Sequence, residues 1–219
     1  MIHLEQVSKV YRSAKGPVRA LDEVSLDVQP GEFVAVRGPS GCGKSTLLTV
    51  VGGLAGATSG RVVVAGEDLG ALSSSGRAAF RRERIGFVFQ TFHLLPYFNV
   101  LDNVLTASPP GPAASARRRA EEILTRFQLG HRLLHLPAEL STGECQRVAI
   151  ARAVVHGPSL LLADEPTGNL DTETSGGVLD LLSDFHRQGG TVLLVTHDES
   201  AAARAQRTVV LRQGRFAIE

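Results

Sequence analysis

Short apolar runs alternate with longer amphipathic stretches along most of the chain. Five runs are mostly apolar and short enough to be strands of a parallel sheet buried on both faces. These runs are residues 32–37, 85–89, 160–163, 191–196 and 208–212. Three amphipathic stretches with helical spacing follow individual strands, at about residues 44–51, 172–188 and 199–205. Strands that alternate with helices predict an α/β fold with a mostly parallel sheet.

The N-terminal part of the chain has a different pattern. Residues 2–11 and 18–28 each look like strands, and residues 13–17 form a polar connection between them. We expect these two strands to form a small antiparallel β-element ahead of the central sheet. Residues 61–65 then predict a short strand, and residues 66–68 predict a turn. A helix is expected at residues 75–84.

The strand pattern disappears between residues 91 and 157. A Pro- and Gly-rich break at residues 108–112 separates stretches of helical periodicity. Those stretches are near residues 100–105, 113–127 and 143–155. We interpret residues 91–157 as a helical subdomain inserted into a core made of residues 1–90 and 158–219. The whole chain, residues 1–219, is then a single domain.

Composition and charge exclude several classes of protein. The 219 residues are 43% hydrophobic and carry a formal net charge of +1, so no bulk electrostatic attraction to nucleic acid is expected. No run reaches the ~18 apolar residues that a transmembrane helix needs, and the first residues lack the features of a signal peptide. Cys42 and Cys145 are far apart, which favours reduced thiols in the cytosol.

Residues 38–46 fill every fixed position of a P-loop. Gly38 and Gly43 are five positions apart, and Lys44 and Ser45 follow directly. Such a loop turns its backbone N–H groups toward a polyphosphate at the start of a helix. The predicted nucleotide-binding residues here are Gly38, Pro39, Ser40, Gly41, Cys42, Gly43, Lys44, Ser45 and Thr46. Lys44 would reach the outer phosphates, and the Ser45 hydroxyl would bind Mg²⁺.

Polar residues follow three of the buried strands at their carboxyl ends, where open α/β sheets bind ligands. Gln90 is either a strand terminator or a ligand of Mg²⁺ that senses the γ-phosphate. Asp164 would hold the Mg²⁺ shell, and Glu165 could act as a base toward water. Two adjacent acids can also be a polar turn, but the upstream P-loop favours the catalytic interpretation. His197 ends the strand at residues 191–196.

The segment 140–144, Leu-Ser-Thr-Gly-Glu, is followed by Cys-Gln-Arg-Val-Ala-Ile-Ala-Arg-Ala. It resembles the signature motif of the ATP-binding subunits of ABC transporters, and the resemblance covers essentially the whole chain. The other family motifs occur in the same order. They are the aromatic residue Tyr11, the P-loop, the Q-loop residue Gln90, the signature, Asp164 and Glu165, the D-loop residue Asp171 and His197.

This resemblance implies an ATPase that binds ATP and Mg²⁺ and works as a pair. Two copies would associate head to tail in the presence of ATP, and Ser141, Thr142, Gly143 and Glu144 of one copy would cap the ATP of the other. Glu165, His197 and Lys44 are the implied catalytic residues, and Asp171 would bridge the two sites. Gln90, Ser45 and Asp164 would hold Mg²⁺, while Tyr11 would stack on the adenine.

Three positions depart from the family pattern. Thr142 stands where the family has the first glycine of the signature. A β-branched residue disfavours positive φ, so we expect backbone strain and lowered activity at this position. Arg37 and Cys145 are also unusual, and the sequence offers no physical reason for either.

Within the family, the chain resembles the lipoprotein-release and macrolide-efflux branch. This implies an ATPase subunit that drives export or release of lipoproteins, lipids or hydrophobic compounds through separate permease subunits. We expect it in the cytoplasm, held peripherally on the inner face of the membrane by the permease, which would dock near residues 97–103. Two alternatives stay open, namely regulation of a permease-like cell-division complex and a soluble ABC-type ATPase outside transport.

Overall fold

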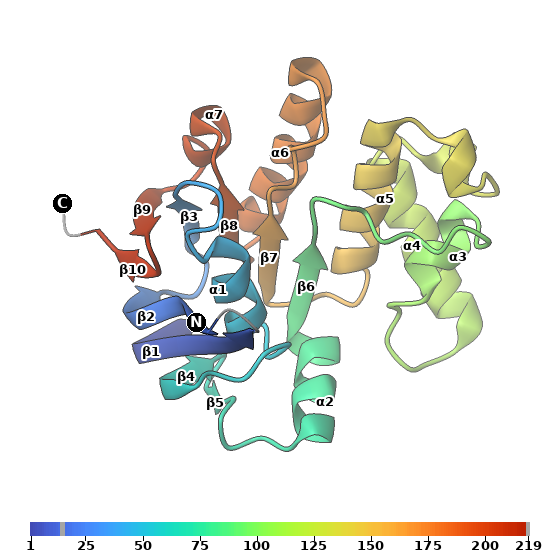
Figure 1. Cartoon of the computed structure of the whole chain (residues 1–219). Coiled ribbons are helices and arrows are strands. Elements are labelled where there is room, and N and C mark those ends of the chain that lie inside the picture. The colour runs from blue at the N-terminus through green and yellow to red at the C-terminus, as the bar shows by residue number, and fades with distance from the viewer. Residues whose placement is uncertain (14–15, 218–219) are drawn as a thin grey trace.

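The computed structural model of the chain describes residues 1–13 and 16–217. Two sheets pack around a central helix, α1, and further helices cover the other face of the larger sheet (Figure 1). The strands are β1 Ile2–Ser13, β2 Gly16–Val28, β3 Phe33–Arg37, β4 Ser59–Val64, β5 Glu67–Asp68, β6 Ile85–Val88, β7 Leu160–Asp164, β8 Thr191–Thr196, β9 Arg207–Arg212 and β10 Arg215–Phe216. The helices are α1 Lys44–Val51, α2 Ser74–Arg84, α3 Val100–Leu105, α4 Ala113–Arg126, α5 Thr142–Val154, α6 Thr172–Arg187 and α7 Glu199–Ala202, with short 3-10 turns at Gly130–Arg132 and Pro137–Glu139.

The larger sheet has six strands in the order β10-β9-β3-β8-β7-β6. Strands β9, β3, β8, β7 and β6 pair in parallel, and β10 pairs antiparallel with β9 at one edge. The prediction of an α/β fold with a mostly parallel sheet is therefore confirmed. The apolar runs that predicted β7 and β8 are buried on both faces, because alternate side chains enter two separate cores.

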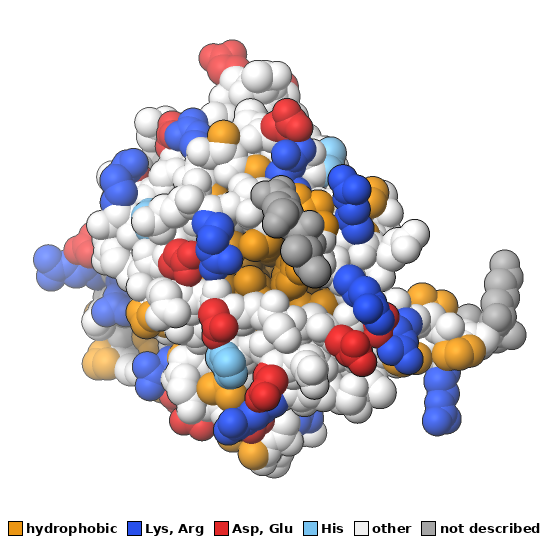
Figure 2. All heavy atoms as spheres, turned by 90° about the vertical axis from the view of Figure 1, so that its left-hand side faces the viewer, with side chains coloured by type: hydrophobic (Ala, Val, Ile, Leu, Met, Phe, Trp, Pro, Cys, Tyr) orange, Lys and Arg blue, Asp and Glu red, His pale blue; other side chains and the backbone are white. Residues whose placement is uncertain are grey.

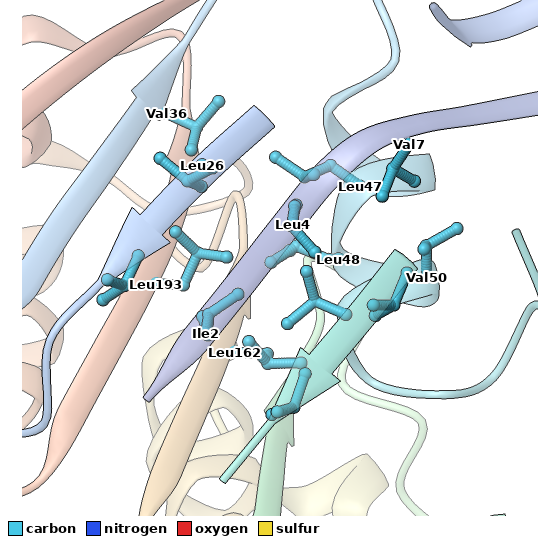
Figure 3. Close-up of a cluster of buried hydrophobic side chains, with 14 of the residues drawn as sticks. Ile2, Leu4, Val7, Leu26, Val36, Leu47, Leu48, Val50, Leu162 and Leu193 are labelled. Atoms are coloured by element: carbon cyan, nitrogen blue, oxygen red, sulfur yellow. The ribbon is translucent and has the colours of Figure 1, made fainter. Parts of the chain in front are cut away.

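The first core lies between the two sheets and encloses α1. Figure 3 shows Leu47 and Leu48 of this helix close to Leu4 of β1, within a cluster that also takes side chains from β3, β7 and β8. Leu162 and Leu193 belong to that cluster, while their neighbours Leu161 and Leu194 belong to the second core. Apolar packing against both the smaller and the larger sheet thus holds α1 in place.

The smaller sheet confirms the predicted antiparallel β-element and corrects one detail. Its order is β2-β1-β4-β5, and the middle of the predicted polar connection, residues 14 and 15, lies outside the described residues. Residues 67 and 68 were expected in a turn, but they form β5 and pair with Val64 and Val63. The turn is Ala65-Gly66, where both residues have positive φ, and such a two-residue turn directs the chain straight back along β4.

Residues 91–157, all of which the structure describes, contain α3, α4, two 3-10 turns and α5, and no strand. The second core joins these helices to the face of the six-stranded sheet that points away from α1. Asn103 of α3 is fully buried and fixes the segment before its helix: its Nδ2 donates to the carbonyls of Leu95, Phe98 and Asn99, and its Oδ1 accepts from the Leu95 N–H at 2.7 Å. The division into a core and a helical subdomain remains our proposal.

The molecular surface mixes charges of both signs. Figure 2 views the side of the molecule that carries β10, and basic and acidic side chains lie next to one another there without a large area of either sign. This distribution agrees with the net charge of +1. Among the described helices, none is both long enough and apolar enough to cross a membrane.

Candidate functional site

The predicted phosphate loop connects the end of β3 to the start of α1. Gly41 and Gly43 have φ values of 76° and 111°, in the left-handed region that favours glycine. A Cβ on Gly38 would lie 2.2 Å from the carbonyl oxygen of Leu211, and one on Gly43 would lie 2.2 Å from that of Ala20. The glycines are therefore required by backbone conformation and by close packing against two neighbouring segments.

Lys44 is the first residue of α1 and is only 5% exposed. Its Nζ donates to the carbonyl oxygens of Gly38 and Pro39, at 2.9 and 3.0 Å, and lies 3.6 Å from Oε1 of Glu165. These acceptors satisfy the hydrogen-bonding needs of the buried ammonium. The oxygens of a phosphate present the same kind of acceptor, so the surroundings of Lys44 fit a bound phosphate.

Asp164 ends β7, and its carboxyl lies close to the Ser45 hydroxyl at the start of α1, in the wall of one pocket. Burial raises the pKa of the Asp164 carboxyl, and the neighbouring Glu165 raises it further, while the Ser45 hydroxyl and the charge of Lys44 lower it. A carboxylate and a hydroxyl that meet in this way are hard oxygen donors, which Mg²⁺ prefers. The two predicted Mg²⁺ ligands are thus brought together.

Glu165 follows Asp164 in a strained conformation with φ of 44°. Its N–H donates to the carbonyl of Val195 at 2.9 Å, and its carbonyl accepts from Gly168 at 3.0 Å, so neighbouring backbone holds the strain. Its Oε2 lies 3.0 Å from Nδ1 of His197, which is 64% exposed. An imidazole with its proton on Nδ1 donates to this carboxylate and fixes its direction.

Gln90 follows β6 and is linked to the segment after Glu165. Its Nε2 lies 3.4 Å from Oδ1 of Asn169, and its backbone carbonyl accepts from Nδ2 of Asn169 at 3.0 Å. Gly168 is also close, because a Cβ there would lie 2.9 Å from Nε2 of Gln90. The role of Asn169 as a support for Gln90 was not predicted, and no sequence pattern indicates it.

A pocket of about 300 Å³ gathers most of these side chains. It is lined by Ala20, Ser40, Gly41, Gly43, Lys44, Ser45, Thr46, Gln90, Asp164 and Glu165. Gly38, Pro39 and Cys42 belong to the loop but do not line this pocket, and neither do Tyr11 and His197. Tyr11 is half-exposed on β1, with Nζ of Lys9 at 5.0 Å from its ring centroid. Ala20 of β2 is a wall of the pocket that the sequence did not reveal.

The signature-like residues lie at the start of α5, in the helical part of the chain, and do not line the pocket. The Ser141 Oγ accepts from the N–H of Glu144, and the Glu144 carboxylate accepts from the N–H of Ser141. This capping box fixes the helix N-terminus, which presents unpaired N–H groups. Gly143 packs against α6, since a Cβ there would lie 2.1 Å from Cγ2 of Thr174. Asp171 caps α6 through Thr174, and that hydrogen bond lowers the pKa of its carboxyl.

The expected backbone strain at Thr142 is wrong. Thr142 is the first residue of α5 and is absent from the described non-glycine residues with positive φ. A helical residue after the cap adopts negative φ, which a β-branched side chain accepts with only a small loss of helix propensity. The lowered activity that we expected at this position therefore loses its physical reason.

Arg37 and Cys145 gain physical explanations. The Arg37 guanidinium at the end of β3 forms an ion pair of 2.6 Å with Glu199 at the start of α7, just after His197. The Cys145 thiol is buried and lies 3.6 Å from the carbonyl oxygen of Pro137, and burial raises its pKa. Arg37 thus joins two segments around the pocket, and Cys145 acts as a small buried residue.

A phosphate loop at the start of a helix, with two acids at the end of another buried strand of the same sheet, defines a P-loop ATPase. A family model described as "ABC transporter" matches residues 21–168, and the chain belongs to the ABC transporter family. The chain is 47% identical to a "Lipoprotein-releasing system ATP-binding protein LolD" of Granulibacter bethesdensis, over 98% of this chain and 95% of that protein. It is 45% identical to a "Macrolide export ATP-binding/permease protein MacB" of Hyphomonas neptunium, over 99% of this chain but 34% of that protein.

The chain therefore spans about a third of the length of its macrolide-export relatives. Among solved structures, a dimeric post-hydrolysis state of the ATP-binding cassette MJ0796, bound to ADP and Pi, superposes with a TM-score of 0.93. The two are 37% identical, over 100% of this chain and 97% of that one. The predicted family, fold and ATPase class are confirmed.

Replacement of Asp164 by asparagine is expected to raise the stability of the protein without nucleotide and metal. Burial raises the pKa of Asp164 above its value in the unfolded chain, so above both values the folded state carries an unfavourable buried charge. Asp164→Asn should increase the free energy of unfolding at neutral pH by about 1 kcal/mol, and the gain should shrink as the pH falls through the pKa. Urea unfolding in chelator at several pH values measures it. The exposed Asp180→Asn is the control, and a less stable Asp164→Asn protein at pH 7 would contradict the prediction.

Proposed function

We propose that the chain is the ATP-binding and ATP-hydrolysing part of an ABC transporter. The observation that carries the proposal is the meeting of the phosphate loop, the buried Lys44 and the Glu165–His197 pair at one edge of the sheet. The phosphate loop and Lys44 bind the phosphates. Glu165 is the base, and its contact with His197 fixes the orientation of its carboxylate. The remaining residues are assigned around these groups.

Nucleotide binding falls to the loop and Lys44. The phosphates lie against the N–H groups of residues 38–46, and Lys44 exchanges its two carbonyl acceptors for phosphate oxygens. Tyr11, half-exposed on β1, is assigned to stack on the adenine. The small pocket takes the phosphates, and the base extends beyond it toward the β1–β2 sheet.

Ser45, Gln90 and Asp164 are assigned to hold Mg²⁺. The Ser45 hydroxyl and the Asp164 carboxylate already meet, and Gln90 lines the same pocket. When bound, Mg²⁺ neutralises charge on the phosphate oxygens. Ionised Asp164 is the form that a cation stabilises, which offsets the cost of its burial.

Hydrolysis is assigned to Glu165 with His197. The Glu165 carboxylate accepts a proton from water as the water oxygen attacks the γ-phosphorus, and the bond from that phosphorus to the bridging oxygen of ADP breaks. His197 contacts Oε2 of Glu165, and Lys44 lies near Oε1 of the same carboxylate. Lys44 also stabilises the charge on the phosphate oxygens. Two fixed neighbours thus direct one base.

A second copy is assigned to complete each site. The open N-terminus of α5, with Ser141 as its cap and the Gly143 N–H nearby, is suited to a γ-phosphate, yet it lies away from the pocket of its own chain. Head-to-tail pairing in the presence of ATP brings this helix to the partner's phosphate, and Thr142 and Glu144 lie beside the contact. Asp171 bridges the sites. Two dimeric structures of one related cassette, MJ0796, support this assembly.

The proposed membrane partner is a permease that moves lipoproteins, lipids or hydrophobic compounds, with the chain held on the cytoplasmic face through it. The names of the lipoprotein-releasing and macrolide-export relatives support this branch. Tyr97 is 91% exposed and Phe98 lies beside it, which supports docking on the segment that Asn103 fixes. Regulation of a permease-like complex without transport is the second candidate.

Copurification from native membranes in a mild detergent tests the proposal. The tagged chain should recover an integral membrane protein with few spans, and Tyr97→Ser should reduce that recovery without changing ATP hydrolysis by the purified chain. The exposed Leu54→Ser is the matched control on another surface. Recovery of no membrane protein would contradict the permease assignment. If the chain then still hydrolysed ATP, the result would favour a soluble ATPase.

A further inference from the structure

The last two strands of the described chain form a tight hairpin beside the phosphate loop. Gln213 and Gly214, its two turn residues, have φ values of 49° and 78°, as a two-residue hairpin turn requires. β9 pairs in parallel with β3, and Val210 lies opposite Arg37, the residue before the loop. Because β3 leads straight into the phosphate loop, the hairpin that follows β9 lies beside that loop (Figure 1).

The hairpin contacts the loop at two points. The N–H of Gly214 donates to the carbonyl oxygen of Cys42, at 2.9 Å. The carbonyl oxygen of Leu211 lies against Gly38, close enough that a Cβ there would approach it to 2.2 Å. The first glycine of the loop and the peptide before Gly43 are therefore both bounded by the hairpin.

Strand β2 ties this hairpin down from the other side. The N–H of Asp22 donates to the carbonyl of Gly214 at 2.8 Å, and Nε of Arg215 donates to Oδ2 of Asp22 at 2.6 Å. Arg19 also donates to the Asp22 carboxylate. Ala20, on the same strand, presents its carbonyl to Gly43 and lines the nucleotide pocket. Hairpin, loop and β2 thus form one hydrogen-bonded unit.

The bond to Cys42 has a direct consequence for phosphate binding. The carbonyl of Cys42 and the N–H of Gly43 belong to the same planar trans peptide, so they point in opposite directions. Fixing the carbonyl against Gly214 therefore fixes the Gly43 N–H on the opposite side, and Gly43 lines the pocket. A loop that binds anions through its N–H groups depends on this orientation.

We propose that the β9–β10 hairpin is a positioning element for the phosphate loop, with Gly214 acting on the Gly43 N–H and Arg215 holding the turn through Asp22. None of the hairpin residues lines the pocket, so the hairpin acts through the loop. This inference rests on the proposed function, because it assumes that the loop binds nucleotide. It assigns a part in that function to a segment that belongs to none of the family motifs, although it contacts the phosphate loop.

The test compares Arg215→Glu with Arg212→Glu. Both change the same charge in the same hairpin, but the Arg212 side chain of β9 is exposed, whereas Arg215 of β10 faces Asp22 and Glu23. Arg215→Glu should weaken ATP and ADP binding roughly fivefold, with kcat at saturating ATP within twofold, while Arg212→Glu stays at the wild-type affinity. Arg215→Lys should recover most of the loss. Amide hydrogen exchange in residues 38–46 should be faster in Arg215→Glu only.

Each outcome decides the proposal. Wild-type nucleotide affinity in Arg215→Glu, or an equal loss in Arg212→Glu, would overturn the positioning role while leaving the proposed function intact. A wild-type chain that binds neither ATP nor ADP would overturn the proposed function itself. If Arg215→Glu does not fold, Arg215→Gln and Asp22→Asn replace it, and unchanged affinity and loop exchange in both would overturn the proposal.

Discussion

Replacement of Glu165 by glutamine is expected to slow ATP hydrolysis by about 10²–10⁴-fold, the contribution of a general base. The amide keeps the size of the side chain and its contact distance to His197 but no longer accepts a proton from water. ATP should still bind, since the loop and Lys44 are untouched, and the pair of copies should stay closed. Phosphate release measures the rate, and size-exclusion chromatography with ATP measures the dimer.

Glu173→Gln is the matched control for this variant, because Glu173 is an exposed carboxylate in the first turn of the nearby α6. It should hydrolyse ATP at the wild-type rate and return to monomer as ATP is consumed. A Glu165→Gln chain that stays monomeric with ATP would count against a site shared between two copies. Near-normal phosphate release would exclude Glu165 as the base.

Replacement of Lys44 by alanine is expected to weaken ATP binding by about 10- to 100-fold, which corresponds to the loss of a hydrogen bond between charged groups. The ammonium is the one buried positive charge described in this pocket, and its present acceptors are two carbonyls at the start of the loop. Without it, the phosphates lose a charge partner and the loop loses two internal bonds. Equilibrium dialysis with ATP measures the affinity.

Arg118→Ala, which removes one exposed charge from the helical part of the chain, controls for the change in net charge. It should bind ATP as the wild type does. The melting temperature of both variants without nucleotide separates weaker binding from weaker folding. An unchanged affinity in Lys44→Ala, at an unchanged melting temperature, would remove Lys44 from the phosphate site.

Sequence patterns predicted most of the fold because buried strands and amphipathic helices leave a periodic signal. The apolar runs that became β7 and β8 are of this kind. The two-residue strands β5 and β10 leave almost no such signal. Residues 67 and 68 were expected in a turn, and no strand was predicted at Arg215–Phe216. Such short strands exist only because a tight turn returns the chain to its neighbour.

The parts of the site that a sequence motif supplies could be predicted. The parts that tertiary contacts between distant segments supply could not. Gly43, Lys44 and Ser45 stand together in the sequence and together in the pocket. The wall made by Ala20 and the hydrogen bond from Gly214 come from segments far from the loop in the sequence, and no motif relates those segments to the loop. The expected strain at Thr142 failed for a related reason, since the capped helix start, not the residue type, decides the local φ.

Asn103 has a consequence for the binding of a partner. Its amide holds the backbone from Leu95 to Asn99 in one conformation while Tyr97 stays almost fully exposed. Ordering a free backbone costs about 1–2 kcal/mol per residue, and here that cost is met when the chain folds. The proposed docking segment is thus already ordered in this chain before a partner arrives, and binding there requires no further ordering of these residues.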